Sequence, residues 1–381
     1  MSPDRRYATH LVCSRTGVTA PLDEPSFLSP TGAPWLVAYD LSGLDGADLA
    51  RRWQRRAWSM WRYRELLPHR DHEGRIDLGE GGTPLIRLRR TADELEVLIK
   101  QEAGNPTGSF KARGLSMAVN RARELEAPGL ELASAGNAAL AMTAFAAAAG
   151  LPSRVAVPED TPPGIIAGCR SYGAEVLTAP GTLAEAAHRL AEFDDGFWNL
   201  STLKEPYRVE GKKTMGLELA EQLDWRLPDW IFYPTGGGTG IVGMQRAFDQ
   251  LEMLGLISGP RPRFVAVQMT GCAPIIKAFE RGDEVSERWA EPDTRVWGLR
   301  VPKAIGDFIV LDAVRGTGGT AVAVDEESIA PTVERLAREE GMLFGPEGAA
   351  CMLALDHLRT AGTIEAGQQV VIFQTGHPAN Y

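Results

Sequence analysis

Short apolar runs alternate with Ala- and Leu-rich stretches along the chain from about residue 95 onward. Runs of β-branched and aromatic residues bounded by Gly or Pro predict strands at residues 94–102, 130–135, 154–158, 174–179, 229–234, 263–268 and 369–374. The Ala- and Leu-rich stretches 115–126 and 139–150 predict helices. Such alternation is typical of α/β proteins whose sheets are largely parallel.

The first eighty residues follow a different pattern, because they are rich in Trp, Arg and Pro and show no alternation of strands and helices. We expect residues 1–80 to form an N-terminal arm. Within it, residues 47–58 predict a helix that carries the arginine run Arg51, Arg52, Arg55 and Arg56. A charge run on a helix favours a solvated or interface face over a phosphate-binding one.

The length and charge of the chain restrict its architecture and its partners. With 381 residues, of which 44% are hydrophobic and 24% charged, we expect two lobes with a cleft that binds a small molecule. Forty Lys and Arg against fifty Asp and Glu leave a formal charge of −10, which argues against a nucleic-acid partner. No apolar run approaches the roughly 20 residues of a membrane span, so we expect no membrane partner.

The four cysteines are scattered and form no Cys-x-x-Cys pair, which favours a reducing compartment and a cytoplasmic location. The segment around Cys13 looks like half a zinc ribbon, but no second cysteine lies two or three residues away. A zinc site there would lack its thiolate ligands. We therefore expect Cys13 to be a small buried residue and the chain to hold no metal.

A lysine follows a turn-forming Asn-Pro-Thr-Gly run in residues 104–114. Ser109 can cap a helix, and Lys111 would stand in its first turn, where the helix dipole and burial both lower the pKa of an ammonium group. A neutral amine so placed can bond to an aldehyde cofactor and later act as a base. The alternative is a surface lysine at an ordinary helix start.

Two further turns follow predicted strands. Asn137 stands after strand 130–135, where it could donate a hydrogen bond to a phenolate oxygen or act as an ordinary helix cap. After strand 229–234 come the residues of a phosphate-binding loop, Gly236, Gly237, Gly238, Thr239 and Gly240. This loop lacks the endings typical of ATP and NAD sites.

The last predicted strand, 369–374, leads to Thr375 and His377. A threonine hydroxyl can hydrogen-bond a pyridine nitrogen without supplying a proton, whereas the role of His377 stays open between a loop residue and an acid or base. A lysine, an Asn turn, a glycine loop and a hydroxyl in this order together describe a pyridoxal 5′-phosphate site.

The chain resembles the tryptophan-synthase-β family of pyridoxal phosphate enzymes, known as fold type II, and within it the threonine synthases. The segments that carry the resemblance are EGGTPL (80–85), NPTGSFK (105–111), SAGN (134–137), STLKEPYRVEGKKT (201–214), PTGGGTG (234–240), VQMTGCAPI (267–275), PEGAA (346–350) and TGH (375–377). The resemblance implies a two-lobed, three-layer α/β sandwich. Its large cofactor lobe would comprise residues 81–114 and 211–381, with the N-terminal arm packed on it, and its small mobile lobe residues 115–210.

The resemblance also assigns roles to individual residues. Lys111 corresponds to the lysine that bonds to the cofactor, Asn137 to the partner of the ring hydroxyl, residues 236–240 to the phosphate loop and Thr375 to the partner of the ring nitrogen. Candidates for binding the substrate are Ser134, Ser201, Thr202, Arg208 and Lys212. A basic segment around them comprises Lys204, Arg208, Lys212 and Lys213.

The activity implied by the resemblance is the conversion of O-phosphohomoserine and water to threonine and phosphate. We also expect the chain to form a homodimer. The chain departs from the threonine synthase pattern at Ala112, at Ala138 and in the C-terminal residues 375–381. The alternatives are a dehydratase of threonine or serine, or a β-replacement enzyme acting on serine or an O-activated serine. A binding protein without catalysis is disfavoured, because binding alone does not require an amine at Lys111.

Overall fold

The computed structural model describes residues 6–90 and 94–380, which divide into two compact units. Unit 1 comprises residues up to 82, residues 105–214 and Asn380, and unit 2 comprises residues 83–104 and 215–379. The mixed helices and strands confirm the predicted α/β class. The arm and the two functional lobes expected from the sequence stay a prediction, since the units follow the packing of the chain.

A small antiparallel sheet occupies the start of unit 1. It consists of β1 (Ala8–Cys13), β2 (Thr19–Pro21) and β3 (Trp35–Tyr39), in the order β2-β1-β3. None of these three strands was predicted from the sequence. β2 has only three residues and the side chains of β1 do not alternate strictly between buried and exposed, so the hydrophobic pattern carries little strand signal.

Helix α1 (Gly46–Gln54) and the 3₁₀ segment η1 (Met60–Leu66) follow this sheet. The arginines at the end of α1 bind carboxylates of their own unit. Arg56 forms two hydrogen bonds with Glu65, of 2.5 and 2.7 Å, and Arg52 lies 3.1 Å from Asp48. Cys13 is buried, as expected.

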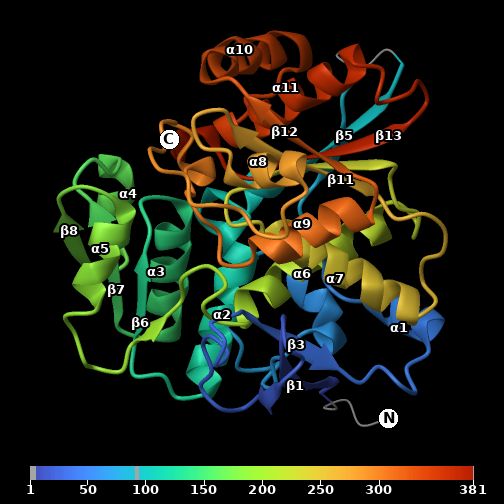
Figure 1. Ribbon diagram of the computed structural model, residues 1–381. Coiled ribbons are helices and arrows are strands. Elements are labelled where there is room, and N and C mark those ends of the chain that lie inside the picture. The colour runs from blue at the N-terminus through green and yellow to red at the C-terminus, as the bar shows by residue number, and fades with distance from the viewer. Residues whose placement is uncertain (1–5, 91–93, 381) are drawn as a thin grey trace. The chain divides into compact units, whose positions relative to one another are not determined.

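The second sheet of unit 1 is parallel and has the order β8-β7-β6-β9. Its strands are β6 (Leu130–Ala133), β7 (Ser153–Pro158), β8 (Glu175–Ala179) and β9 (Trp198–Asn199). The helices are α2 (Lys111–Glu124), α3 (Asn137–Ala149), α4 (Pro163–Ser171) and α5 (Leu183–Leu190). Helix α6 (Tyr207–Gln222) begins in unit 1, and its residues from Met215 onward belong to unit 2. Helix α5 packs against β6, β7 and β8 (Figure 1). One apolar core joins Leu11 and Val37 of the N-terminal sheet to Leu115 of α2, which explains why the first eighty residues belong to unit 1.

Unit 2 is built on a six-stranded sheet with the order β12-β11-β10-β13-β5-β4 (Figure 1). Its strands are β4 (Leu85–Arg87), β5 (Glu96–Gln101), β10 (Trp230–Pro234), β11 (Arg263–Met269), β12 (Thr320–Val324) and β13 (Gln369–Gln374). All neighbouring strands are parallel except β4, which is antiparallel to β5. The carboxyl ends of β10 and β13 therefore meet at one edge of the sheet.

Five helices surround this sheet: α7 (Thr239–Met253), α8 (Pro274–Arg281), α9 (Asp307–Gly316), α10 (Ile329–Glu340) and α11 (Pro346–Thr360). Helix α11 contacts β10, β11, β12 and β13. Short 3₁₀ segments lie at η2 (Glu102–Gly104), η3 (Pro106–Gly108), η4 (Trp297–Leu299), η5 (Glu326–Ser328) and η6 (Pro378–Asn380). Within residues 6–90 and 94–380, no helix has the length and apolar character needed to cross a membrane.

Candidate active site

Lys111 is the first residue of α2 and is half-buried. The expectation that Ser109 caps this helix is wrong, because the residue before the first helical turn is Phe110. The backbone carbonyl of Ser109, rather than its hydroxyl, accepts a hydrogen bond of 3.2 Å from the N–H of Ala112. The Ser109 hydroxyl is buried and has no hydrogen-bond partner among the described residues, so the structure leaves a polar atom unused two residues before Lys111.

Helix α6 crosses α2 closely beside Lys111. A Cβ atom added to Gly211 would come within 2.0 Å of the Arg113 carbonyl oxygen, and one added to Gly114 would come within 2.9 Å of the Arg208 carbonyl oxygen. Only glycine allows two helix backbones to approach so closely. This crossing brings the first turns of α2 and α6 together, and with them Lys111, Arg208 and Lys212.

The crossing concentrates positive charge. The Phe110 ring lies under both amines, with its centroid 4.2 Å from Lys111 Nζ and 4.8 Å from Lys212 Nζ. Burial lowers the pKa of Lys212 well below its ordinary value, and repulsion from Arg208 and Lys111 lowers it further. An anion bound here would relieve this repulsion.

Arg208 is buried beside Lys111 and Lys212, and only 1% of its surface is exposed. Its Nη1 donates a hydrogen bond of 2.5 Å to the Leu200 carbonyl, whereas Nε and Nη2 have no hydrogen-bond partner among the described residues. These two N–H groups form the edge with which an arginine binds a carboxylate or a phosphate through two bonds. Arg208 therefore offers an unused anion-binding edge in the interior of unit 1.

Glu205 lies beside Arg208 and was not among the site residues predicted from the sequence. Its carboxylate accepts hydrogen bonds from the backbone N–H groups of Tyr207 (2.7 Å) and Arg208 (3.1 Å) at the start of α6. Burial raises the pKa of Glu205 to about 7, while the Arg208 guanidinium acts in the opposite direction. Glu is not among the residue types that usually cap a helix, so no local signal in the sequence indicated this role.

The basic segment predicted at residues 204–213 does not act as one cluster. Lys213 forms a buried ion pair with Glu210, and its Nζ lies 4.0 Å from the centre of the Tyr39 ring. Tyr39 also donates a hydrogen bond of 2.6 Å to Glu210. Lys213 thus joins α6 to the N-terminal sheet, and it is not grouped with Lys111, Arg208 and Lys212.

Asn137 opens α3, and its side chain does not cap that helix. Gly136 is the capping residue, so the alternative of an ordinary Asn cap is excluded. The Oδ1 atom of Asn137 accepts a hydrogen bond of 2.6 Å from Asn380. The Ser134 hydroxyl accepts one of 3.3 Å from Gly136 N–H, which shapes the turn that presents Asn137.

The remaining substrate candidates lie between β9 and α6. Ser201 donates its backbone N–H to Asn199 Oδ1 at 3.0 Å, and Thr202 follows it; both are half-buried. They belong to unit 1, as do Lys111, Asn137, Ser134, Arg208 and Lys212. Electrostatic interactions at the crossing of α2 and α6 link Lys111, Arg208 and Lys212. Ser201 follows Leu200, whose carbonyl accepts a hydrogen bond from Arg208.

The predicted phosphate loop belongs to unit 2 and follows β10. Gly238 has φ +71°, precedes α7, and would bring a Cβ atom to 2.2 Å from the Val310 side chain. A Cβ on Gly236 would come to 2.3 Å from the Gly298 carbonyl, and one on Gly240 to 2.1 Å from the Tyr233 ring. The loop therefore requires glycine at three positions, which is the condition for a backbone that closes around a phosphate.

The backbone N–H groups of this loop are available to a ligand. Those of Gly236, Gly237 and Gly238 form no hydrogen bond to another described residue. They stand at the N-terminus of α7, where the helix dipole favours an anion. A bound phosphate would accept hydrogen bonds from these N–H groups and would be stabilised by the positive end of the α7 dipole.

Thr375 follows β13 and is 3% exposed. Because β10 and β13 are parallel neighbours, Thr375 and the glycine loop lie at the same edge of the sheet of unit 2. Gln374 donates a hydrogen bond of 3.0 Å to the Gly376 carbonyl, and His377 Nδ1 accepts one of 3.1 Å from Ala379 N–H. His377 is exposed and closes the C-terminal turn.

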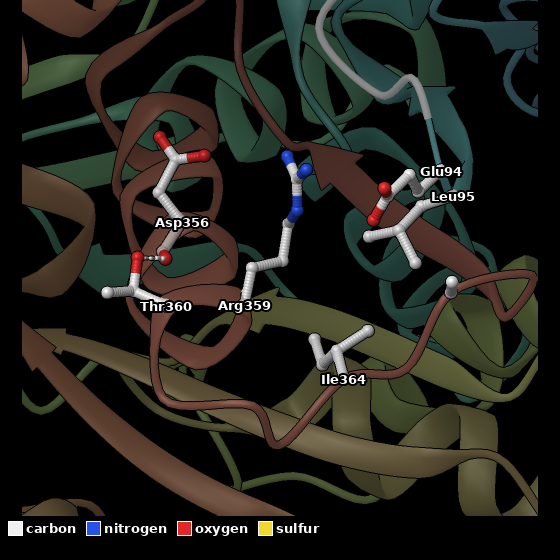
Figure 2. Close-up of a pocket in the computed structure, with 7 residues that line it drawn as sticks. Glu94, Leu95, Asp356, Arg359, Thr360 and Ile364 are labelled. Atoms are coloured by element: carbon white, nitrogen blue, oxygen red, sulfur yellow. Dashed lines mark hydrogen bonds between the residues drawn. The ribbon is translucent and has the colours of Figure 1, made fainter.

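A separate hollow of about 440 Å³ lies at the opposite edge of this sheet. Figure 2 shows side chains that line it, from the segment before β5, from the end of α11 and from the segment after α11: Glu94, Leu95, Asp356, Arg359, Thr360 and Ile364. Glu94 and Leu95 precede the amino end of β5, whereas the glycine loop follows the carboxyl end of β10. None of the predicted site residues lines this hollow. In the described residues, no group of three His, Cys, Asp or Glu side chains is placed to hold a metal ion.

Comparison with known proteins identifies close counterparts. The family model described as pyridoxal-phosphate dependent enzyme matches residues 76–376. The threonine synthase of Methanocaldococcus jannaschii is 31% identical over 371 residues, which cover 96% of this chain and 91% of that protein. The threonine synthase of Methanosarcina acetivorans is 32% identical and covers 97% of this chain and 91% of its own length.

Solved structures share the fold. The processed form of threonine deaminase isoform 2 from Solanum lycopersicum aligns with a TM-score of 0.66 and 24% identity, over 77% of this chain and 83% of that one. Maize serine racemase aligns with a TM-score of 0.66 and 21% identity, over 78% and 88% of the two chains. These alignments confirm the predicted architecture.

Proposed function

The chain belongs to the threonine synthase family of pyridoxal phosphate-dependent enzymes, and from this we propose that it converts O-phosphohomoserine and water to threonine and phosphate. The observation that carries the proposal is Arg208, whose buried Nε and Nη2 atoms have no partner among the described residues beside the turn that holds Lys111. Buried guanidinium groups are normally fully paired. A phosphorylated substrate would supply the missing partner.

The residues present fit the cofactor. The absence of a Cβ at Gly236, Gly238 and Gly240 lets the loop pack against its neighbours in unit 2. The N–H groups of the loop, at the start of α7, suit the cofactor phosphate. Thr375 offers a hydroxyl to the ring nitrogen, and Lys111 offers an amine to the aldehyde. When bound, the cofactor supplies electron withdrawal from the carbon atoms next to the substrate's amino group.

Lys111 is the base in this proposal. Its amine would hold the cofactor aldehyde, and the same amine would take a proton from Cα of the substrate and then one from Cβ. The C–O bond at Cγ then breaks, and phosphate leaves with the bonding electrons. Water adds at Cβ, and protons returned to Cγ and Cα complete threonine, so that the atoms balance.

Arg208 orients the substrate by binding its phosphate through two hydrogen bonds. Lys212, which shares the crossing of α2 and α6, would donate a further hydrogen bond to the phosphate, whose negative charge would offset the burial and repulsion that lower the pKa of this amine. Ser134, Ser201 and Thr202 supply hydroxyl groups in the adjoining turns of unit 1. Glu205 holds the backbone at the start of α6, which fixes Arg208 in place.

The test compares Arg208→Ala with Lys204→Ala, which removes a charge from the same basic segment but not from the helix crossing. We expect Arg208→Ala to raise the KM for O-phosphohomoserine at least about 30-fold, because loss of a buried charge partner costs about 2 kcal/mol or more. Binding of threonine, read from the absorbance of the bound cofactor, should change far less. An equal loss for threonine and O-phosphohomoserine would place Arg208 in structural support.

A further inference from the structure

Gln268, a fully buried residue of β11, connects the start of the glycine loop with the start of α8. Its Nε2 atom donates a hydrogen bond of 2.9 Å to the carbonyl of Thr235, the residue before Gly236. Its Oε1 atom accepts hydrogen bonds from the backbone N–H groups of Ile275 (2.9 Å) and Ile276 (3.3 Å). These N–H groups belong to the first turn of α8, where the helix itself offers no acceptor. One side-chain amide thus serves both elements.

These three partners determine which end of the Gln268 amide faces the loop. A backbone N–H can only donate, so the atom that faces Ile275 and Ile276 must be the oxygen. A backbone carbonyl can only accept, so the atom that faces Thr235 must be the nitrogen. A glutamine meets both conditions, whereas an ionised glutamate of the same shape meets only the first.

The hydrogen bond to Thr235 also determines where the next N–H group points. The peptide bond between Thr235 and Gly236 is trans, and the C=O and N–H bonds of a trans peptide point in opposite directions. Because the Thr235 carbonyl points to Gln268, the Gly236 N–H points away from Gln268. This N–H donates to no residue that the structure describes, so it is available to a ligand on that side.

Other contacts prevent the loop from shifting as a whole. The Thr235 N–H donates a hydrogen bond of 2.8 Å to the Val267 carbonyl and so continues the pairing of β10 with β11. On the other side, the backbone of Gly236 lies against Gly298, since an added Cβ would come to 2.3 Å from the Gly298 carbonyl oxygen. The peptide can therefore change direction only by rotating its plane, and the hydrogen bond from Gln268 opposes that rotation.

We propose that Gln268 is a positioning residue for the phosphate of the cofactor. It holds the Thr235 carbonyl away from the phosphate, so that the Gly236 N–H faces the phosphate as a donor. A rotated peptide would instead present a carbonyl oxygen, which repels an anion. This inference rests on the proposed function only for the cofactor site. Gln268 acts through the peptide between Thr235 and Gly236 and touches no reacting atom.

The sharpest variant is Gln268→Glu, which keeps the acceptor for α8 but replaces the donor by oxygen. A carboxylate oxygen would face the Thr235 carbonyl and favour rotation of the peptide. Gln250→Glu is the matched control, because Gln250 is also buried in unit 2. It lies near the end of α7, about 16 Å along the helix from its first residue.

The test measures two dissociation constants on the purified, cofactor-free protein: that of pyridoxal 5′-phosphate and that of pyridoxal, which lacks the phosphate. For Gln268→Glu we expect pyridoxal phosphate to bind about 10- to 100-fold more weakly, the effect of one lost hydrogen bond to a charged group. Pyridoxal should lose far less affinity, because it has no phosphate to contact Gly236. Gln250→Glu should keep the ratio of the two constants found for the wild-type protein.

If Gln268→Glu does not fold, Gln268→Met carries the same test, because it removes the donor without adding a charge. It too should lower the preference for pyridoxal phosphate over pyridoxal.

An unchanged ratio of the two dissociation constants would overturn the proposal. An equal loss of affinity for both ligands would also overturn it, because that result describes a residue that only stabilises unit 2. If the wild-type protein binds the cofactor but forms no threonine, the proposed reaction fails while this ratio still decides the role of Gln268.

Discussion

At the scale of single residues, the chemistry depends on a few polar groups that the fold leaves unsatisfied. Arg208 Nε and Nη2 and the Ser109 hydroxyl are buried without partners among the described residues, and Lys212 is buried beside two other cations. Each of these conditions costs free energy in the absence of a ligand. Their concentration around the first turn of α2 identifies Lys111 as the centre of the reaction in our proposal.

Replacing Lys111 by Ala should abolish both covalent attachment of the cofactor and turnover. Without the amine, borohydride reduction should leave no cofactor on the peptide that contains residue 111, as measured by mass spectrometry of a digest. The phosphate loop of unit 2 is untouched, so non-covalent cofactor binding should persist. Lys204→Ala, the matched control, should keep the label on Lys111. Full activity of the Ala variant would remove Lys111 from the mechanism.

The residues predicted from the sequence are those whose motif is local. Lys111 at a helix start and the glycines after a strand can be recognised within a few positions. Gln268 and the free edge of Arg208 cannot, because their roles depend on how other elements pack around them: 33 positions separate Gln268 from Thr235. Ser109 was predicted as a cap because its type fits, but its hydroxyl is not used that way.

At the scale of elements, close backbone approaches determine where the functional groups stand. Gly114 and Gly211 permit the crossing of α2 and α6, and the glycines of 236–240 permit the loop between β10 and α7. Strands β5, β6, β7, β8, β10, β11 and β13 and helices α1, α2 and α3 followed from the hydrophobic pattern. The strands β1, β2, β3 and β12 did not: β2 has only three residues, β1 does not alternate strictly, and most of β12 is only partly buried.

Gly238→Ala and Gly255→Ala form a matched pair, because both glycines have left-handed φ angles, +71° and +67°. Both variants should lose about 1 kcal/mol of unfolding free energy, because alanine disfavours a left-handed φ angle. A Cβ at 238 also meets the Val310 side chain, whereas none lies within 4 Å at 255. We expect Gly238→Ala to lose a further 1–3 kcal/mol or so of unfolding free energy and at least about tenfold in cofactor affinity. Urea unfolding and cofactor titration measure both, and identical behaviour of the pair would contradict this role of the loop.

His69 makes the stability of unit 1 depend on pH. The ring is buried against Trp61, and its Nε2 lies 3.2 Å from Glu124 at the end of α2. Burial lowers the pKa of His69 from 6.5 to about 4, although Glu124 acts in the opposite direction. The unfolded chain therefore binds the proton more readily, and stability should rise as pH increases from about 4 to 6.5, by at most about 3 kcal/mol.

His69→Gln should flatten this rise in urea unfolding measured between pH 4.5 and 7.5. His188→Gln, at an exposed position of α5, is the control and should keep the wild-type slope. A slope unchanged by His69→Gln would show that other groups account for the pH dependence.

At the scale of the whole molecule, an overall charge of −10 coexists with a local excess of positive charge where α2 and α6 cross. The α/β class and parallel sheets followed from the alternation of elements, but the grouping of residues 6–82 with 105–214 did not. That grouping depends on an apolar core shared between the N-terminal sheet and α2, which no local pattern reveals.

The homodimer and the cytoplasmic location stay predictions, and light scattering on a sizing column should give twice the mass of one chain.

The most direct test of the account is the product formed by the purified holoenzyme. Incubated with O-phosphohomoserine, it should release inorganic phosphate and form threonine in equal amounts, and with threonine or serine alone it should form little 2-oxo acid. Formation of 2-oxo acid and ammonia from threonine or serine, without phosphate release from O-phosphohomoserine, would contradict the account and identify a dehydratase on the same fold.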